Sequence, residues 1–335
     1  MALKIIKTGF ALSAVVLLFF CIWLVQGIYT APKTSAHEII FEVERGKGAK
    51  TIAQGLKKRE VLKQELPFLL TYKLFFFPKS LKAGEYAFSL PLSAKDVLST
   101  LSEGKVYLHP LTIPEGLTAK EISELLSSAD FVRDENFLEA FSQTESISSL
   151  DREAQNLEGY LFPETYFLPK GTPSEKIILT MISQFKEAFK VEWQKKAQKI
   201  GLTVREVVIL ASLIEKETSI PEEKNLVSSV FHNRLRIGMK LDCDPTIIYV
   251  LKHEGRFKDR LRTKDLKYDT PYNTYLYPGL PPGPICNPGR ESLEAALYPA
   301  EEDYLYFVSK NDGSHQFSRT FKEHQRAVIK YQIRK

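Results

Sequence analysis

The sequence is poor in the residues on which several classes of protein depend. Its 335 residues include three cysteines, too few for a disulfide scaffold. The six histidines are scattered, and none falls in a metal-binding spacing such as H-E-x-x-H, so a zinc site is not expected. No lysine or arginine block is dense enough for a nucleic-acid-binding stripe, although the formal net charge is +5. With 44% hydrophobic and 26% charged residues, the chain is neither disordered nor fibrous.

One long segment has no charge at all. Residues 8–32 contain no Asp, Glu, Lys or Arg, and their core, 10–28, is almost entirely Leu, Val, Ile, Phe and Ala. About 20 such residues in a helix span the roughly 30 Å hydrocarbon layer of a bilayer. Lys4 and Lys7 precede the segment, so the positive-inside rule places the N-terminus in the cytosol and the rest of the chain outside.

The sequence therefore predicts a retained single-pass anchor. A cleaved signal peptide is the alternative, with cleavage after residues 34–36, but the apolar run is longer than the about 7–15 residues of a signal peptide. On this topology Cys243 and Cys286 face an oxidising compartment, and the sequence leaves open whether they pair. The predicted layout is a cytoplasmic N-terminus over 1–8, a transmembrane helix over 9–30 and a linker over 31–37.

The next segment, residues 38–108, is expected to form a small α+β unit. Alternating apolar and charged residues predict a first strand, and apolar residues at helical spacing predict the helices. The order strand, helix, helix, strand resembles a LysM module, a small glycan-binding fold; a generic α+β spacer is the other interpretation. The predicted elements are a strand at 38–44, helices at 51–58 and 65–74, a strand at 82–88, and a further short helix from Ser93 to Leu101.

The second unit, residues 109–335, contains the most informative helix. A capping box at 203–206 precedes the apolar run 207–214, which ends in Glu215-Lys216-Glu217. An almost wholly apolar, buried helix thus finishes in two carboxylates. Residues two apart lie about 200° apart on a helix, so the two carboxylates cannot face one cleft.

Two features of this helix end raise the pKa of a carboxyl group. The C-terminus of a helix carries partial negative charge, and the preceding residues Leu213 and Ile214 provide apolar surroundings. A carboxylic acid that stays partly protonated near neutral pH suits a general acid. The alternative on helix geometry alone is a solvated helix end without a catalytic role.

Long loops follow this helix. Residues 271–275 and 279–289 are dense in Pro, Gly, Asn and Tyr, and such loops commonly line sites. Aromatic rings stack on sugar rings, and amides hydrogen-bond sugar hydroxyls. Each loop alone is interpretable as a rigid connector; together they predict an extended polar cleft for a glycan.

Nine stretches of the sequence, in order, resemble the MltG/YceG family, the endolytic murein transglycosylases of the bacterial inner membrane. The resemblance covers nearly the whole chain, including the anchor. It implies an α+β fold with a single transmembrane helix, a small LysM-like subdomain and an α+β catalytic domain. The matching stretches are IPEG (113–116), EGYLFPETY (158–166), ASLIEKET (211–218), VFHNRL (230–235), DPT (244–246), YNTY (272–275), GLPPG (279–283), NPG (287–289) and YLYFV (304–308).

The resemblance also implies which residues act. The catalytic residue of the family is the second Glu of the E-K-E-T motif, here Glu217, and substrate-binding positions fall on other family motifs. Family members commonly have L-Q-x-D-P-T where this chain has Asp242 in place of the amide. The residues expected in the cleft are Glu223, which also matches a family acidic position, with Asn233, Arg234, Asp244, Asn273, Thr274 and Tyr275.

The activity that the resemblance implies is cleavage of the β-1,4 bond between N-acetylmuramic acid and N-acetylglucosamine, which leaves a 1,6-anhydro end without metal or cofactor. Nascent peptidoglycan strands would be the substrate, with penicillin-binding proteins or other wall-synthesis proteins as candidate partners and no nucleic acid. Two alternatives stay open. A hydrolytic muramidase would need a base such as Asp242 or Asp244, and a non-catalytic scaffold would only bind glycan.

Overall fold

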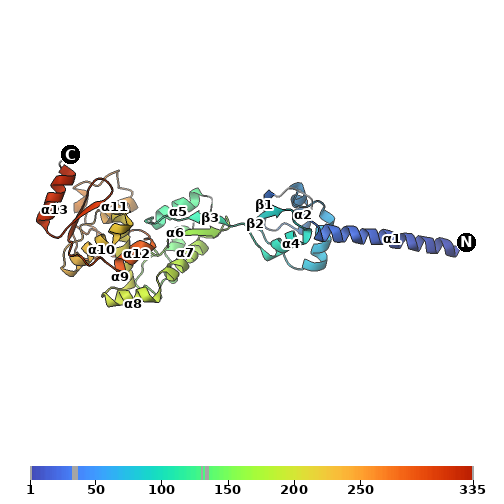
Figure 1. Ribbon diagram of the computed structural model, residues 1–335, viewed down its shortest axis with the longest axis horizontal. Helices are drawn as coiled ribbons and strands as arrows, with labels where there is room; N and C mark the ends of the chain where they lie inside the picture. The colour runs from blue at the N-terminus through green and yellow to red at the C-terminus, as the bar shows by residue number, and fades with distance from the viewer. Residues whose placement is uncertain (1, 32–36, 130, 133–135, 334–335) are drawn as a thin grey trace. The chain divides into compact units, whose positions relative to one another are not determined.

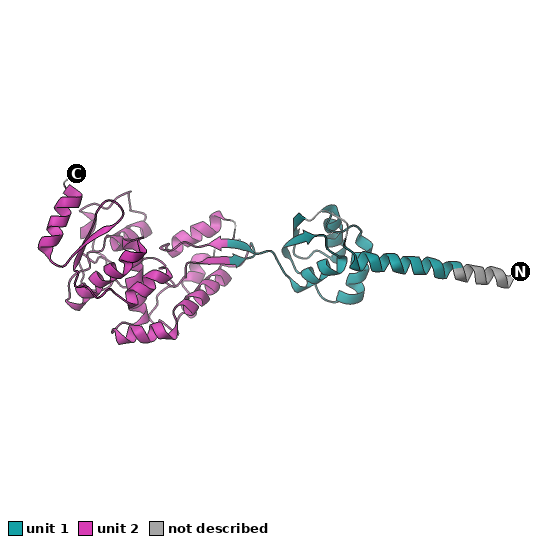
Figure 2. Ribbon diagram, in the orientation of Figure 1, with its two compact units in different colours: residues 1–110, 167–170 teal, residues 111–166, 171–335 magenta. Residues whose placement is uncertain are grey.

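The computed structural model describes residues 2–31, 37–129, 131–132 and 136–333 (Figure 1). The chain divides into two compact units (Figure 2). The first comprises residues 1–110 with 167–170, and the second comprises 111–166 with 171–335. The predicted linker at 31–37 and the alternative cleavage site at 34–36 fall largely outside the described residues.

Helix α1 (Ala2–Tyr29) contains the uncharged segment. Among the described residues it is the one helix long and apolar enough to cross a membrane, with a mean hydropathy of 2.2 over Leu12–Tyr29. Its last two turns are partly covered, because α1 packs against α3 and α4 of the same unit and Ile28 is buried. The structure is compatible with the predicted anchor.

The small unit has the predicted order of elements. Strands β1 (His37–Val43) and β2 (Gly84–Leu90) pair antiparallel, with Ile40 opposite Ala87. Helix α2 (Ala49–Lys58) buries Ile52, Ala53 and Leu56, and its apolar face packs with both strands into one core. The other elements are α3 (Glu65–Thr71), the π-helical turn η1 (Tyr72–Phe76) and α4 (Ala94–Glu103), which begins with a capping box of Ser93 and Asp96.

The second unit is mainly helical. Strands β3 (His109–Thr112) and β4 (Thr165–Leu168) form a two-stranded sheet, and β5 (Tyr306–Ser309) pairs antiparallel with β6 (His315–Ser318). Helix α9 packs against α8, α10, α11 and α12, and its buried face occupies the core of the unit. The helices are α5 (Ala119–Ser128), α6 (Phe137–Phe141), α7 (Ser174–Ala188), α8 (Val191–Lys199), α9 (Val204–Glu217), α10 (Pro221–Arg236), α11 (Asp244–His253), α12 (Arg290–Leu297) and α13 (Phe321–Val328), with short turns η2 (Asp265–Lys267) and η3 (Ile329–Ile333).

The apolar residues from 178 to Trp193 follow the spacing of one helix, which predicts a single long helix from residue 174. The structure has two helices here, because Phe189 leaves helical geometry at φ −86°, ψ 69°. The apolar spacing continues past this break, since Phe189 contacts both Phe185 and Trp193, with ring centroids 5.7 Å apart in each case. The run Thr-Pro-Ser-Glu at 172–175 predicts a capping box with Pro173 as the first helical residue. In the structure Pro173 is instead the N-cap of α7, and it has no side chain that can cap.

The run from Gly238 to Tyr249, with Gly, Asp and Pro, predicts a turn, but the second half of this run is helical. Helix α11 begins at Asp244, with Pro245 in its first turn. Proline is tolerated there because the first N–H groups of a helix have no partner within the helix. Pro221 plays the same part at the start of α10, so α9 and α10 are separated by three residues.

Candidate active site

Both ends of α9 are well defined by local structure. Thr203 and Glu206 form the predicted capping box at its start, and residues 207–214 are all buried. The helix stops at Glu217 because Thr218 is extended, with φ −143° and ψ 137°. The core that holds α9 therefore sets where Glu215 and Glu217 emerge.

Glu215 is directed to the start of α12. Its Oε2 accepts hydrogen bonds from the backbone N–H of Gly289 at 3.0 Å and from the hydroxyl of Ser292 at 2.6 Å. The buried ammonium of Lys224 lies 3.6 Å away. A helix N-terminus carries partial positive charge, so these contacts attract the Glu215 carboxylate to the start of α12 and join α9 to α12.

Lys224 is the centre of a charge cluster. Its Nζ lies 3.8 Å from Glu115, 3.6 Å from Glu215 and 3.5 Å from Glu291, and the residue is only 3% exposed. A buried ammonium is tolerated only with such partners. Glu215 therefore has a structural part as a partner of the buried Lys224 ammonium.

Glu217 has a different environment. It is partly exposed, and the thiol of Cys243 donates a hydrogen bond to its carboxylate. Burial of the carboxyl group raises the pKa of Glu217 to about 7, and the negative charge of Asp244 acts in the same direction. The positive charges of His315 and Arg234 lower the pKa but do not reverse the shift. The sequence-based expectation of a raised pKa at this helix end is thus met, with burial as the main cause.

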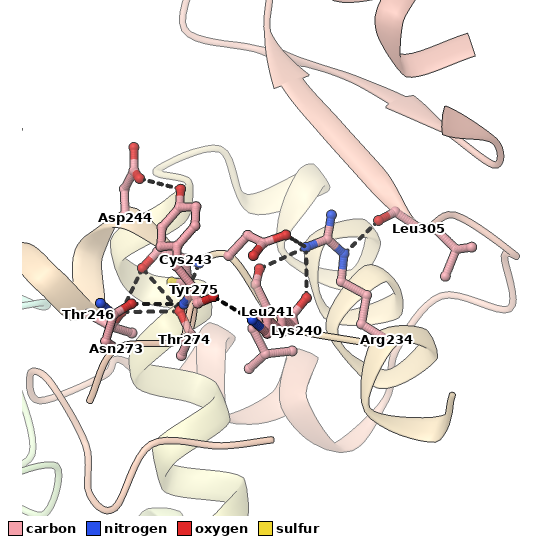
Figure 3. Close-up of polar contacts among 11 residues, drawn as sticks. Arg234, Lys240, Leu241, Cys243, Asp244, Thr246, Asn273, Thr274, Tyr275 and Leu305 are labelled. Atoms are coloured by element: carbon pink, nitrogen blue, oxygen red, sulfur yellow. Dashed lines mark hydrogen bonds and ion pairs between the residues drawn. The ribbon is translucent and has the colours of Figure 1, made fainter. Parts of the chain in front are cut away.

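Arg234 holds the loop that leads to Cys243 (Figure 3). Its Nε donates to the carbonyl of Leu305 at 2.7 Å, and its Nη1 donates to the carbonyls of Lys240 and Leu241 at 3.1 and 2.9 Å. Nη1 also contacts the carboxylate of Asp242 at 3.3 Å. Arg234 is 8% exposed, so most of its hydrogen-bonding capacity is used within the chain.

Asp242, the departure from the family pattern, lies in the left-handed region at φ 48°, where Asp and Asn are better tolerated than most residues. Its N–H donates to the carbonyl of Thr274 at 3.3 Å, and its carboxylate pairs with Arg234. Burial raises the pKa of Asp242.

The loop at 273–275 is bound to the start of α11 (Figure 3). The hydroxyl of Thr274 accepts from the backbone N–H of Cys243 at 2.9 Å. The hydroxyl of Tyr275 donates to Oδ1 of Asp244 at 2.5 Å. Asp244 is exposed and Tyr275 partly exposed, so this pair is accessible beside the catalytic candidate, whereas Thr274 is buried.

Asn273 and Asn233 are almost fully buried and used within the chain. The Nδ2 of Asn273 donates to the carbonyls of Leu266 and Tyr268 at 3.0 and 2.7 Å, and its Oδ1 accepts from the N–H of Tyr275. The Nδ2 of Asn233 donates to the carbonyls of Glu302 and Tyr304, and its Oδ1 accepts from Arg236. Both amides hold loop backbone in place.

Glu223 connects α10 to β6 and to the residue after Glu217. It accepts from the backbone N–H of His315 at 2.8 Å and contacts His315 Nδ1 at 2.6 Å. The hydroxyl of Thr218 lies 3.4 Å from the same carboxylate. Glu223 is 9% exposed, so it is positioned to orient neighbours rather than to meet a large ligand.

The predicted residues therefore fall into two groups around Glu217. Asp244 and Tyr275 have accessible polar groups, and Glu217 is partly exposed beside them. The remaining residues are buried and hold the surrounding backbone. No group of three or more His, Cys, Asp or Glu in the described part of the chain is arranged to hold a metal ion. The buried group is Glu223, Asn233, Arg234, Asn273 and Thr274.

Residues 41–330 match the sequence model of the YceG-like family. The chain belongs to this family. An endolytic murein transglycosylase of Bacillus subtilis (strain 168) is 34% identical to this YceG-like chain over 318 residues, which cover 89% of this chain and 86% of that protein. The enzyme of the same name from Streptococcus pneumoniae (strain ATCC BAA-255 / R6) is 30% identical over 323 residues, which cover 86% of this chain and 57% of that protein.

A crystal structure of a yceG-like protein from Listeria monocytogenes has the same fold. It superposes with a TM-score of 0.58 at 32% identity, and the match covers 86% of this chain and 98% of that one. A mixed α+β architecture is thus common to both YceG-like chains.

Two neighbours of Glu217 in this YceG-like chain were not among the predicted site residues. Cys243 was considered only for a disulfide, whereas it is free, buried and hydrogen-bonded to Glu217; Cys286 is also free and buried. His315 was not singled out, because a lone histidine in a short polar hairpin has no catalytic spacing. Its contact with Glu223 joins positions 92 residues apart, which no local pattern reveals.

Proposed function

We propose that this chain is an endolytic peptidoglycan transglycosylase and that Glu217 is its single general acid and base. The observation that carries the proposal is the contrast at the end of α9. Glu215 is bound to the start of α12, whereas Glu217 is partly exposed and has a pKa raised by burial to about 7. A group that gives and then takes a proton near neutral pH needs such a pKa.

The reaction uses one carboxyl group twice. Protonated Glu217 gives its proton to the glycosidic oxygen as the bond from C1 of N-acetylmuramic acid breaks, and the N-acetylglucosamine side leaves with a free 4-hydroxyl. The 6-hydroxyl of the same muramic residue then bonds to C1 and releases its proton to the Glu217 carboxylate. The enzyme returns to its starting state, and the product carries a 1,6-anhydro ring. A water molecule is not consumed, so a second carboxylate at the separation found in hydrolases is not needed.

The neighbours of Glu217 have distinct parts in this proposal. The carboxylate of Asp244, oriented by Tyr275, is an electrostatic partner for the positive charge that develops on the sugar. Arg234, Asn233, Asn273 and Thr274 hold the two loops that carry them. Their contribution is to fix the geometry before the substrate binds.

Placement at a membrane would explain endolytic action. With α1 as an anchor in the bacterial inner membrane and the N-terminus in the cytosol, the second unit acts outside, where new glycan strands emerge. A cut there ends the elongation of a strand. The small unit, if it is LysM-like, would bind the same glycan, and other wall-synthesis proteins would be its neighbours.

The test is a digest of purified peptidoglycan by the full chain in detergent, with products analysed by mass spectrometry. We expect muropeptides that are lighter by one water than reducing ends and that resist borohydride. Reducible ends would instead establish a hydrolase, with Asp244 as the candidate base. Binding without any product would favour the scaffold interpretation.

A further inference from the structure

The small unit has an exposed apolar cluster beside the end of α1. Leu74, Phe75 and Phe77, in and just after η1, are 65%, 64% and 69% exposed, and Leu66 of α3 is 46% exposed. We refer to these four residues as the apolar cluster. Large aromatic and aliphatic side chains exposed together on a small unit mark a surface with a partner.

The structure places α3, which carries Leu66 and leads into η1, against the end of α1. Helix α1 lies against α3, and a Cβ added at Gly27 would meet the ring of Pro67 in α3. Helix α3 continues directly into η1. In Figure 1 the light-blue chain of this region adjoins the end of α1. A groove of about 760 Å³ beside the end of α1 is lined by Trp23 and Gly27 of α1, by Pro67 of α3 and by residues near the end of α2 and the start of α4.

The part of α1 that contacts the small unit indicates the depth of this unit in the membrane. From Trp23 to Tyr29 a helix rises about 9 Å, at about 1.5 Å per residue, so the unit packs along the last 9 Å of α1. In a helix that spans a bilayer this stretch lies in the outer interfacial zone, where Trp and Tyr are common. The parts of the small unit that pack here are therefore at the height of the lipid headgroups.

The charged residues within the segment that carries the cluster are all lysines, whereas Glu65 just before it pairs with Lys57, and Glu103 lies near Lys79. From residue 66 to residue 84 the chain contains Lys73, Lys79 and Lys82 and no Asp or Glu. At the end of α1 itself, Lys95 of α4 lies over the ring of Tyr29 at 5.2 Å. Lysines that flank exposed Phe and Leu complement an anionic lipid surface.

We propose that the apolar cluster inserts into the outer leaflet of the membrane that α1 crosses, with Lys73 and Lys79 at the headgroups. The occupant of this surface is thus lipid. The insertion gives the small unit a second attachment besides α1 and limits its tilt on the bilayer. The proposal rests on α1 being a transmembrane anchor and is independent of the reaction at Glu217.

The experiment uses the full chain in nanodiscs of phosphatidylethanolamine and phosphatidylglycerol. An environment-sensitive fluorophore is attached to Phe75→Cys in a Cys21→Ser background; Cys243 and Cys286 are buried and do not compete. The matched control is Lys50→Cys, at the exposed start of α2, because the other end of α2 lines the groove with α1. A nitroxide on the lipid acyl chain serves as quencher.

We expect the label at position 75 to be blue-shifted and quenched about twofold or more, because side chains inserted about 5–10 Å reach the acyl boundary. The label at position 50 should emit as in water. Equal, water-like emission at both positions would overturn the proposal. Quenching that depends on protein density but not on the nitroxide lipid would also overturn it, in favour of a contact between two chains. Extraction of the chain by alkaline carbonate would refute the anchor and the insertion together.

Discussion

The two carboxylates in the last turn of α9, Glu215 and Glu217, differ in the hydrogen-bond donors and charges around them. On one side Glu215 receives a backbone N–H, a hydroxyl and a buried ammonium. On the other side Glu217 receives a weak thiol donor and lies near the negative charge of Asp244. The same residue type is bound to a helix start in one case, and in the other burial raises its pKa to about 7. Helix geometry separates the two tasks, since residues two apart face opposite directions.

The largest expected effect tests the Glu217 side. Glu217→Gln removes the transferable proton and keeps the shape, so we expect the formation of anhydro ends to fall by about 10²–10⁴-fold or more. Thermal unfolding checks that the fold is retained. Glu215→Gln is the matched control, because it makes the same change two residues away. Activity retained in Glu217→Gln would refute the assignment, and loss in Glu215→Gln alone would move it.

The second effect is a pH dependence of stability. The pKa of Glu217 is raised in the folded chain, from 4.5 to about 7, so the folded state binds the proton more tightly than the unfolded state. The stability from this group is fully present below pH about 4.5 and is lost as the pH rises towards about 7, by about 2–3 kcal/mol.

Comparison with Glu217→Gln isolates this term from the other carboxyl groups, including Glu158, whose pKa burial raises to about 8. The wild-type melting temperature, relative to that of Glu217→Gln, should fall between pH 4.5 and 7. A constant difference across this range would show that the pKa is not raised.

The third effect tests the Glu215 side. Glu215→Gln removes the charge that faces Lys224 and the start of α12, and we expect a loss of about 1–2 kcal/mol in the free energy of unfolding. Activity per folded molecule should change little. Denaturant unfolding measures the loss. Glu291→Gln is the control, since Glu291 is as near to Lys224 but its side chain is 58% exposed; equal losses in both variants would contradict the capping role of Glu215.

The smallest effect concerns His315. Its positive charge lowers the pKa of Glu217, so His315→Gln should raise that pKa and move the alkaline fall in kcat/KM upward by about half a pH unit. His232→Gln, on α10 but bonded to Ala296, should leave the profile in place. A loss of activity in His315→Gln without a shift would assign His315 a purely structural part.

Local rules were enough to predict several elements. The capping box at Thr203 and the helix start at Ser93 form as expected, because such boxes depend on residues three apart. The end of α9 is also predictable, because Pro221, four residues after Glu217, cannot continue the helix. The start of α11 at Asp244 was missed, since an Asp-Pro pair fits both a turn and a first helical turn.

The site could be predicted less fully than the helices. The opposed directions of Glu215 and Glu217 follow from helix geometry, and the raised pKa follows from the apolar run before them. The partners of Glu215 on α12 and of Glu223 on β6 are 77 and 92 residues away, and only tertiary packing brings them together. The hydrogen bonds from the Asn233 and Asn273 amides to loop carbonyls likewise cannot be predicted from the sequence.

The contact between Glu223 and His315 also bears on when the protein becomes active during its own synthesis. Helix α9 emerges from the ribosome long before β6 does, because it lies about 100 residues earlier in the chain. Until residue 315 has followed, the carboxylate of Glu223 lacks its partner, and the backbone after Glu217 is not yet fastened. A chain still being synthesised therefore carries the Glu217 carboxyl group without its finished surroundings, and these are complete only when nearly all of the chain has been made.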